Sequence, residues 1–380
     1  MKITRIEALV AGIEHRNQVF VRTHTDEGIH GVGEAYNVGP DLATVSWVDY
    51  FAEQLVGRDP TRIEQLWALA YQGARFPIGS SGMAALSGIE HSLWDITGKA
   101  LDLPVYKLLG GRVRDRVPVY HGVHADDPGL LAEHALEKIE AIGIGAVKTN
   151  PLATTWRQGT WNDAIRTART RIAALRAAVG PDVDIGLDAH AAVWELPKAL
   201  DLADSLAEYS PMFMEEPLRM ENRHAMGELR KKMPFALATG ECLYTKFEFE
   251  DLVRAEAADI LQPDICICGG MMEMRKIAAL AEGHDLVVAP HNPLGPLATV
   301  INVHFAAATS NFLILEYREP DSIERALVTE TLKPKDGYVA IPDRPGWGID
   351  IVEQAVKKHP YKNAWHRGDR VYPDGAVAFI

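Results

Sequence analysis

Short apolar runs that each end in a polar residue recur along the middle of the chain, and they constrain its fold more than any other feature. Between most of them lie stretches of helical periodicity, among them 164–179 and 271–282. Strands that alternate with helices form parallel sheets, and eight such units favour a closed α/β barrel over an open sheet. The runs end near the following residues: Tyr120, Lys148, Asp188, Glu215, Glu241, Asp264, His291 and Glu316. In a barrel these polar residues lie on one rim.

Three of these strand ends carry carboxylates at nearly equal spacing. Asp188, Glu215 and Glu241 lie about 26 residues apart, which is one strand plus one helix per step. At one end of a barrel such oxygen ligands suit Mg²⁺ and are a poor match to zinc. A single acidic residue here would more simply cap a helix, but three in register predict a magnesium site. Strand alternation should turn the adjacent Glu216 away, so Glu215 is the predicted ligand.

The chain is too long for one barrel alone. Its 380 residues exceed an ordinary barrel of about 250, which leaves roughly a hundred for a second domain. The first residues alternate apolar and polar side chains around a DEG turn, which is typical of an antiparallel meander, and a helical segment follows at 81–100. We predict an α+β capping domain at 1–116, a barrel at 117–320, and a loop-rich segment at 321–380 that returns to the capping domain.

Composition narrows the possible partners. A hydrophobic fraction of 47% with 24% charged residues is that of a soluble globular protein. The net charge of −13 disfavours nucleic acid, because a phosphate backbone needs a basic surface. No apolar run approaches about 18 residues and the start lacks a signal peptide, so we expect no membrane association and a cytoplasmic location. The three cysteines cannot make a disulfide framework, and Cys266 and Cys268 are expected to pack in the core.

Two histidines fall at strand ends beside the carboxylates. His190 follows Asp188 by two residues, so on a continuing strand both side chains would face the same way. His291 and Asp264 end neighbouring strands, where the carboxylate would orient the imidazole and raise its proton affinity. A lone histidine at a strand end is more often structural, but two beside a predicted metal site indicate proton transfer.

The sequence motifs KTN, DAH, EEP, GEC, QPD and PHNPLGP, in this order after GKALDLPVYKLLGG, resemble the enolase superfamily over essentially the whole chain. Within it the chain is similar to the acid sugar dehydratases related to galactonate dehydratase. The resemblance implies an α+β capping domain joined to a modified (β/α)7β barrel. It also implies removal of the proton beside a substrate carboxylate, a step that needs a bound metal to stabilise the enolate charge. A Lys or His base with Mg²⁺ is the known pattern of this superfamily.

The resemblance also implies roles for individual residues of the rim. Members that racemise or cycloisomerise commonly carry a second lysine where Asn150 stands, so the base would be His190. Lys148 would contact the substrate carboxylate or a metal ligand, and a rim lysine held by its neighbours is the alternative. Glu316 would donate to the enolate oxygen opposite the metal, with a helix cap or a partner for Arg318 as its alternative.

Loops of the capping domain would close over the distal end of the substrate. By the same resemblance the candidates are NVGP, which begins with Asn37, and RFPIGSS, which begins with Arg75. After the first and third barrel strands, His121, His124 and Trp194 are expected either to line the pocket or simply to pack against their neighbours.

These inferences predict a Mg²⁺-dependent dehydratase of a sugar acid, an aldonate, that eliminates the C3 hydroxyl to give a 2-keto-3-deoxy acid. An epimerase, racemase or cycloisomerase on the same enolate is the alternative, and it needs two bases but no leaving-group acid. A non-catalytic regulatory barrel would need neither the ligand set nor the histidines. DAHAAV and HNPLGP depart from the galactonate dehydratase pattern, so the sugar acid itself stays open. We expect a homo-oligomer.

Overall fold

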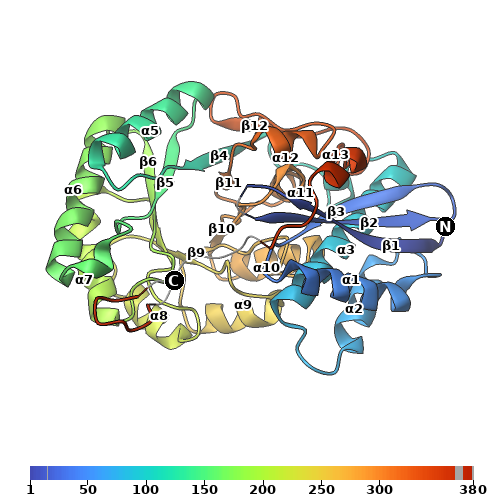
Figure 1. Ribbon diagram of the computed structural model, residues 1–380, viewed down its shortest axis with the longest axis horizontal. Coiled ribbons are helices and arrows are strands. Elements are labelled where there is room, and N and C mark those ends of the chain that lie inside the picture. Colours follow the sequence, from blue (N-terminus) through green and yellow to red (C-terminus); the bar gives the residue numbers. More distant parts are fainter. Residues whose placement is uncertain (15, 364–370, 379–380) are drawn as a thin grey trace.

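The computed structural model describes residues 1–14, 16–363 and 371–378, and it contains a ring of parallel strands joined to a smaller capping domain (Figure 1). The strands pair in chain order, and the last returns beside the first. A bridge between Val288 and Phe312 closes the remaining gap. The expected modified (β/α)7β barrel is confirmed. Its strands are β4 (Arg116–Gly122), β5 (Ala146–Thr149), β6 (Asp184–Asp188), β7 (Phe213–Glu215), β8 (Leu237–Thr239), β9 (Ile260–Leu261), β10 (Val287–Val288) and β11 (Leu315–Tyr317).

Helices surround the strands, and local sequence signals set where they begin and end. Asp127 accepts a hydrogen bond from the Leu130 amide at the start of the first barrel helix, and Gly143 ends that helix at a φ of 66°. Thr160 and Asp163 form a capping box at the start of the second helix. The helices are α5 (Pro128–Ile142), α6 (Trp161–Val179), α7 (Leu196–Leu206), α8 (Arg223–Arg230), α9 (Thr245–Arg254), α10 (Met271–Glu282) and α11 (Pro296–Ala307).

Side chains fill the inside of the ring, so the barrel is a packed core rather than a pore. One interior layer contains Tyr120, Ala146, Phe213, Ala238, Ile260 and Ala289, all almost fully buried. Gly186 faces the Phe213 ring so closely that a Cβ there would lie 2.9 Å from it. The interior is therefore filled, and the polar side chains lie at the carboxyl ends of the strands.

The capping domain begins with the antiparallel meander predicted from its alternating pattern. Gly31 and Gly33 allow the third strand to lie against the long helix, because a Cβ at either position would lie about 2 Å from a helix carbonyl oxygen. The elements are β1 (Ile3–Gly12), β2 (Asn17–Thr25), β3 (His30–Ala35), α1 (Asp41–Leu55), α2 (Ile63–Gly73), α3 (Gly79–Leu101) and the short α4 (Val105–Leu108).

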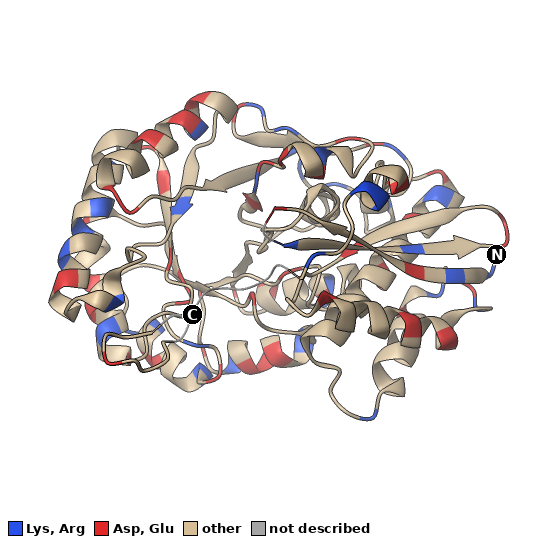
Figure 2. Ribbon diagram, viewed as in Figure 1, with Lys and Arg blue, Asp and Glu red and all other residues tan. Residues whose placement is uncertain are grey.

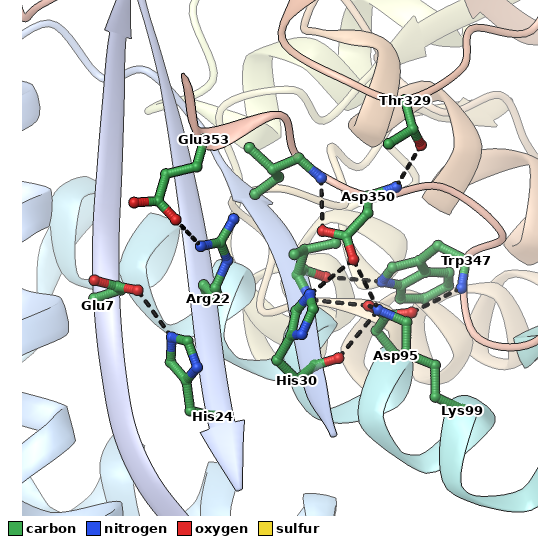
Figure 3. Close-up of polar contacts among 12 residues, drawn as sticks. Glu7, Arg22, His24, His30, Asp95, Lys99, Thr329, Trp347, Asp350 and Glu353 are labelled. Carbon is green, nitrogen blue, oxygen red and sulfur yellow. Dashed lines mark hydrogen bonds and ion pairs between the residues drawn. The ribbon is translucent and has the colours of Figure 1, made fainter. Parts of the chain in front are cut away.

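The chain returns to the capping domain after the last barrel strand. It passes through α12 (Ser322–Ala326), through β12 (Tyr338–Ala340), which pairs antiparallel with β4, and through α13 (Glu353–Lys358). Figure 3 shows the contacts with the cap: Arg22 pairs with Glu353 at 2.7 Å, and Asp95 accepts the Trp347 amide at 2.9 Å. The buried Trp347 indole also donates to the Val32 carbonyl oxygen at 3.0 Å. Both ends of the chain thus build the cap.

Charged residues of both signs are interspersed over the outer helices and connecting loops (Figure 2). Cys266 and Cys268 are fully buried in the core, as expected, whereas Cys242 is exposed. Within the described part of the chain, no helix combines the length and apolarity that a membrane crossing requires.

Candidate active site at the barrel rim

Four strands of the barrel, β5, β6, β7 and β11, bring a buried lysine and three carboxylates together at their carboxyl ends. Lys148 Nζ lies 3.1 Å from Asp188 Oδ2, 2.8 Å from Glu215 Oε2 and 3.2 Å from Glu316 Oε1. The side chain of Glu215 is fully buried, and Lys148 and Asp188 are almost so. The predicted convergence of strand ends on one rim therefore places these groups in mutual contact.

The charges in this cluster depend on one another. Burial raises the pKa of Glu215 well above its usual range, with the Asp188 charge adding to the effect. Burial also opposes ionisation of Asp188, but the nearby Lys148 and His190 outweigh it and lower the pKa of that carboxyl. Because three carboxylates surround it, Lys148 has a pKa well above its usual value despite its burial. A cation is thus required to hold these carboxylates together as anions.

Glu215 supplies a direct test of whether a metal ion fits this cluster. Its Oε2 accepts hydrogen bonds from Lys148 and from Gln262 Nε2 at 2.9 Å, whereas its fully buried Oε1 has no hydrogen-bond partner. A buried carboxylate oxygen without a donor is costly unless a cation satisfies it. An oxygen ligand of this kind suits a hard divalent cation. The ligand atoms of the predicted set Asp188, Glu215 and Glu241 do not, however, all lie within 4.8 Å of one another.

Glu216 corrects one expectation from the sequence. Strand alternation predicted that it would point away from the site, but β7 ends at Glu215 and Glu216 takes a left-handed φ of 37°. Its side chain therefore lies with Glu241 and Cys242, and ligand atoms of these three are all within 4.8 Å of one another. Among the described residues this is the group that satisfies that distance; of the predicted ligands it contains Glu241 but neither Asp188 nor Glu215, and Glu216 joins the candidates. Alternation holds only while a strand continues.

His190 lies beside the carboxylate cluster, although not for the predicted reason. The strand ends at Asp188, and both His190 and Ala191 adopt left-handed backbone conformations, with φ of 49° and 52°. The His190 amide donates to Asp188 Oδ1 at 3.0 Å, and its Nε2 lies 3.4 Å from Oδ2. The side chain is 45% exposed and faces the cavity described below, where a substrate could reach it.

His291 lies beside two other carboxylates of the rim. Its Nδ1 lies 2.9 Å from Asp264 Oδ2, and its Nε2 lies 3.5 Å from Glu241 Oε2. The two strands end earlier than predicted, but a parallel bridge between Asp264 and His291 continues their alignment into the loops. Burial lowers the pKa of His291, but Glu241, the hydrogen bond with Asp264 and the charge of Glu316 raise it to about 10. The imidazole is therefore protonated at neutral pH.

Tyr36 was missed by the sequence reasoning. It follows β3 of the cap, and its ring stacks on the His291 ring with centroids 6.1 Å apart at 29°. Burial, with the nearby Asp264 and Glu241, raises the Tyr36 pKa well above its usual range, so the phenol remains protonated. Its position directly before Asn37, in a loop already considered for substrate contact, is the signal that could have identified it.

Glu316 accepts hydrogen bonds here rather than donating them. Its Oε2 accepts the Asn292 amide at 2.9 Å, while Oε1 faces Lys148. Burial favours the neutral acid, but Lys148 and His291 outweigh it and lower the pKa of Glu316. The donor role implied by the family resemblance would thus require a proton delivered from a neighbour.

A cavity of about 800 Å³ opens next to His190. The loops after β4, β5 and β6 line it together with α6, and its polar lining includes His124, Asn150, Thr154, Arg157 and His190. Asn150 Oδ1 accepts the Leu152 amide at 2.8 Å, which shapes this wall. The buried Arg171 stabilises the same wall, because it donates to three backbone carbonyl oxygens of the two loops.

Four residues predicted to contact the substrate do not border this cavity. His121 is near Tyr317 with its Nδ1 2.6 Å from the Gly122 carbonyl oxygen, and it does not border the cavity. Trp194 borders a separate cavity of about 290 Å³. Arg75 is exposed on the cap, with its guanidinium 5.8 Å from the Phe76 ring. Asn37 is buried, and both its side-chain polar atoms have no hydrogen-bond partner. None of the four lines the 800 Å³ cavity.

The structure combines a parallel barrel with an α+β cap, and its carboxyl rim carries converging carboxylates, a buried lysine and two histidines. This combination is typical of enzymes that transfer protons with the help of a metal ion. The chain belongs to the enolase superfamily, in the mandelate racemase and muconate lactonizing enzyme family. Residues 4–110 match the family described as "Mandelate racemase / muconate lactonizing enzyme, N-terminal domain", and residues 130–355 match "Enolase C-terminal domain-like".

Individual relatives resemble the whole chain. It is 34% identical to D-galactonate dehydratase of Xanthomonas axonopodis and 35% identical to that of Variovorax paradoxus, each over 100% of both chains. A solved enolase from Agrobacterium radiobacter, provisionally described as a galactarate dehydratase and bound to sodium and L-malate, is 42% identical over 100% of both chains, with a TM-score of 0.95. The sequence is therefore that of a galactonate dehydratase-like member of the superfamily.

Proposed function

We propose that this protein is a Mg²⁺-dependent hydro-lyase that dehydrates a sugar acid, an aldonate, to a 2-keto-3-deoxy acid. The observation that carries the proposal is the placement of two histidines beside two different carboxylates of the barrel rim. His190 lies beside Asp188, and His291 lies beside Glu241. This arrangement allows one group to remove a proton and the other to supply one. The names of the D-galactonate dehydratase relatives support the same reaction type.

Asp188, Glu215 and Glu241 would hold the divalent cation, with Glu216 as a fourth candidate. When bound, Mg²⁺ supplies the positive charge that stabilises a developing enolate. Lys148 already neutralises part of this cluster and lies where it can contact either a ligand or the substrate carboxylate. The orphaned Glu215 Oε1 is the structural support for this assignment.

The two imidazoles account for the proton transfers of the reaction. His190, partly exposed to the cavity, removes the proton from C2. His291, protonated and held through Nδ1 by Asp264, donates the Nε2 proton to the C3 hydroxyl, which leaves as water. The enol that remains takes up a proton at C3 and becomes the 2-keto-3-deoxy acid.

The remaining hydroxyl chain of the substrate would extend into the cavity beside His190. Its walls offer polar groups from Asn150, Thr154 and Arg157 on the barrel side. One solved relative is bound to L-malate, a hydroxy acid, which supports a hydroxy acid as the class of ligand. Distal recognition by the barrel loops would replace the role first given to Asn37 and Arg75.

An epimerase is the second candidate, because it would use the same enolate. It needs a base on each face of C2 and no acid for a leaving group, whereas the relatives of this chain are named dehydratases and His291 Nδ1 is held by Asp264, which leaves Nε2 free to serve a leaving hydroxyl. The dehydratase is therefore the better match.

The first test is a screen of the purified protein with Mg²⁺ against aldonates and aldarates, in which 2-keto acids are detected. Two variants are then compared in D₂O for exchange of the C2 proton and for dehydration. His190→Asn should lose both C2 exchange and dehydration. His291→Asn should retain exchange, provided that His190 exchanges its proton with solvent, while dehydration slows by about 10²–10⁴. His284→Asn is the matched control, since this exposed histidine follows the far end of α10. Exchange with inversion and no keto acid from any substrate would favour the epimerase.

A second test concerns the metal ligands. Glu215→Gln should abolish turnover and weaken Mg²⁺ binding measured by calorimetry, because it removes an oxygen aimed at the ion. Glu216→Gln, the neighbouring change of equal size, should retain measurable binding if Glu215 is the ligand. The reverse pattern would reassign the ligand, and full activity in excess EDTA would refute the metal.

A further inference from the structure

The loop that follows His291 is held from several directions at once. The Asn292 amide donates to Glu316 Oε2 at 2.9 Å. The Pro293 carbonyl oxygen accepts from Arg318 Nε at 3.0 Å and from Arg16 Nη2 at 2.5 Å. The Leu294 carbonyl oxygen accepts from Arg318 Nη2 at 3.2 Å. Arg16 belongs to the cap, so the capping domain reaches a loop that begins next to a proposed catalytic residue.

Glu34, at the end of β3 in the cap, makes two further cross-domain contacts with a single carboxylate. It is almost fully buried, and its two oxygens accept the Gly295 amide at 3.0 Å and the Ala298 amide at 2.8 Å. These amides belong to the loop and to the first turn of α11, whose free N–H groups favour an anion. The carboxylate thus joins the cap to the start of the helix that follows His291.

Gly295 shows how closely the two domains meet at this point. A Cβ at that residue would lie 1.9 Å from Gln18 Nε2 and 2.7 Å from Glu34 Oε1. Only glycine leaves room for Glu34 to reach the backbone amide. Gly295 cannot move toward the cap, and Glu34 binds both its amide and the Ala298 amide, so Glu34 fixes the end of the loop that leads into α11.

We propose that Glu34 is a positioning residue for the proton-donor step: it fixes the loop 292–295 against the cap and thereby holds His291 toward the substrate. This inference rests on the proposed function for its catalytic consequence, whereas the anchoring itself does not depend on the substrate. Small displacements of a catalytic group can cost a large part of the rate, so the anchor has a measurable role.

Glu90 provides a matched comparison within the same domain. This buried glutamate of α3 accepts the Met271 amide at 2.8 Å and the Met272 amide at 2.9 Å, at the start of α10. Both glutamates bind two amides of a barrel helix, and burial raises the pKa of each from 4.5 to about 7. The Glu90 anchor lies seven residues beyond Asp264, whereas Glu34 binds the fourth residue after His291.

The experiment compares Glu34→Gln with Glu90→Gln in the Mg²⁺-loaded protein at about pH 8, above the pKa of both carboxyls. Hydrogen exchange followed by mass spectrometry reports the anchoring without substrate. Glu34→Gln should speed exchange in peptides covering 291–299 about tenfold, as expected for a lost hydrogen bond to a charged group. Glu90→Gln should instead speed exchange around 271–275.

With the acid found by the screen, the ratio of C2 exchange to dehydration reports the positioning. Glu34→Gln should slow dehydration roughly 10-fold or more and leave exchange nearly unchanged, whereas Glu90→Gln should leave the ratio at its wild-type value. An unchanged hydrogen-exchange pattern in Glu34→Gln would refute the anchor, and an unchanged ratio would refute positioning. If wild type acts on no acid, the proposed function fails, and the anchor is decided by hydrogen exchange alone.

Discussion

Glu34→Gln should also change how the stability of the fold depends on pH. Burial of Glu34 raises the pKa of its carboxyl from 4.5 to about 7, with Glu324 adding to this effect and the amides of Ala298 and Gly295 and the charge of Arg16 opposing it. The difference corresponds to about 3 kcal/mol, at about 1.4 kcal/mol for each pKa unit. Because the group is fully buried, solvent does not screen this energy appreciably.

The sign follows from proton linkage. The folded state binds the Glu34 proton more tightly than the unfolded chain does, so the stabilisation is complete below about pH 4.5 and is lost as the pH rises through about 7. Glutamine does not titrate. The unfolding free energy of wild type minus that of the variant should therefore fall by about 3 kcal/mol between pH 4.5 and 8.

Urea unfolding followed by circular dichroism, in EDTA so that metal release contributes nothing, measures this difference. Subtraction is needed because buried His91 and His304 have pKa values lowered to about 4, and their contribution rises with pH over much of the same range. His91 contacts the Glu34 backbone carbonyl rather than its carboxylate, so the substitution leaves that contribution in place. A difference that stays constant within about 1 kcal/mol would show that Glu34 is ionised in the fold throughout, and would refute the reasoning.

Three further predictions concern the cluster, the domain contact and the cavity. Lys148→Met should lower the free energy of unfolding by about 3–5 kcal/mol in EDTA, because it leaves buried carboxylates without a cation. Excess Mg²⁺ should restore much of this stability in thermal unfolding, and equal losses in both conditions would contradict a metal centre here. Gly295→Ala should destabilise by about 1–3 kcal/mol in urea, whereas Gly145→Ala, where a Cβ meets nothing within 4 Å, should be nearly neutral. Thr154→Val should change relative kcat/KM among sugar acids more than Arg75→Ala, and the reverse ranking would return specificity to the cap.

Periodicity predicted the elements of this fold well. The helix expected at 271–282 has those bounds, and the expected helix at 164–179 begins only three residues early, at Trp161. The carboxyl ends of parallel strands meet on one rim by geometry, so Asp188, Glu215 and Lys148 could be brought together from spacing alone.

Details beyond the strand ends could not be predicted in this way. Glu216 and His190 turn through left-handed backbone conformations, which alternation does not anticipate. Tyr36 and Glu34 reach the rim from a different domain, and no periodic pattern encodes a contact across so long a sequence separation. The cavity walls likewise depend on loop conformations that local propensity leaves open.

The capping domain, built from both ends of the chain, has a consequence for biosynthesis. Asn17 in β2 donates to the Lys362 carbonyl oxygen across 345 residues of sequence, and Gly12 donates to His359. During translation the meander emerges before the barrel. Its Gly12 amide and Asn17 side chain lack these partners until residues 359–362 have been synthesised. The barrel can close its ring in the meantime. The cap is therefore begun before the barrel and completed after it, so translation that stops between the last barrel strand and His359 would leave a closed barrel with an incomplete cap.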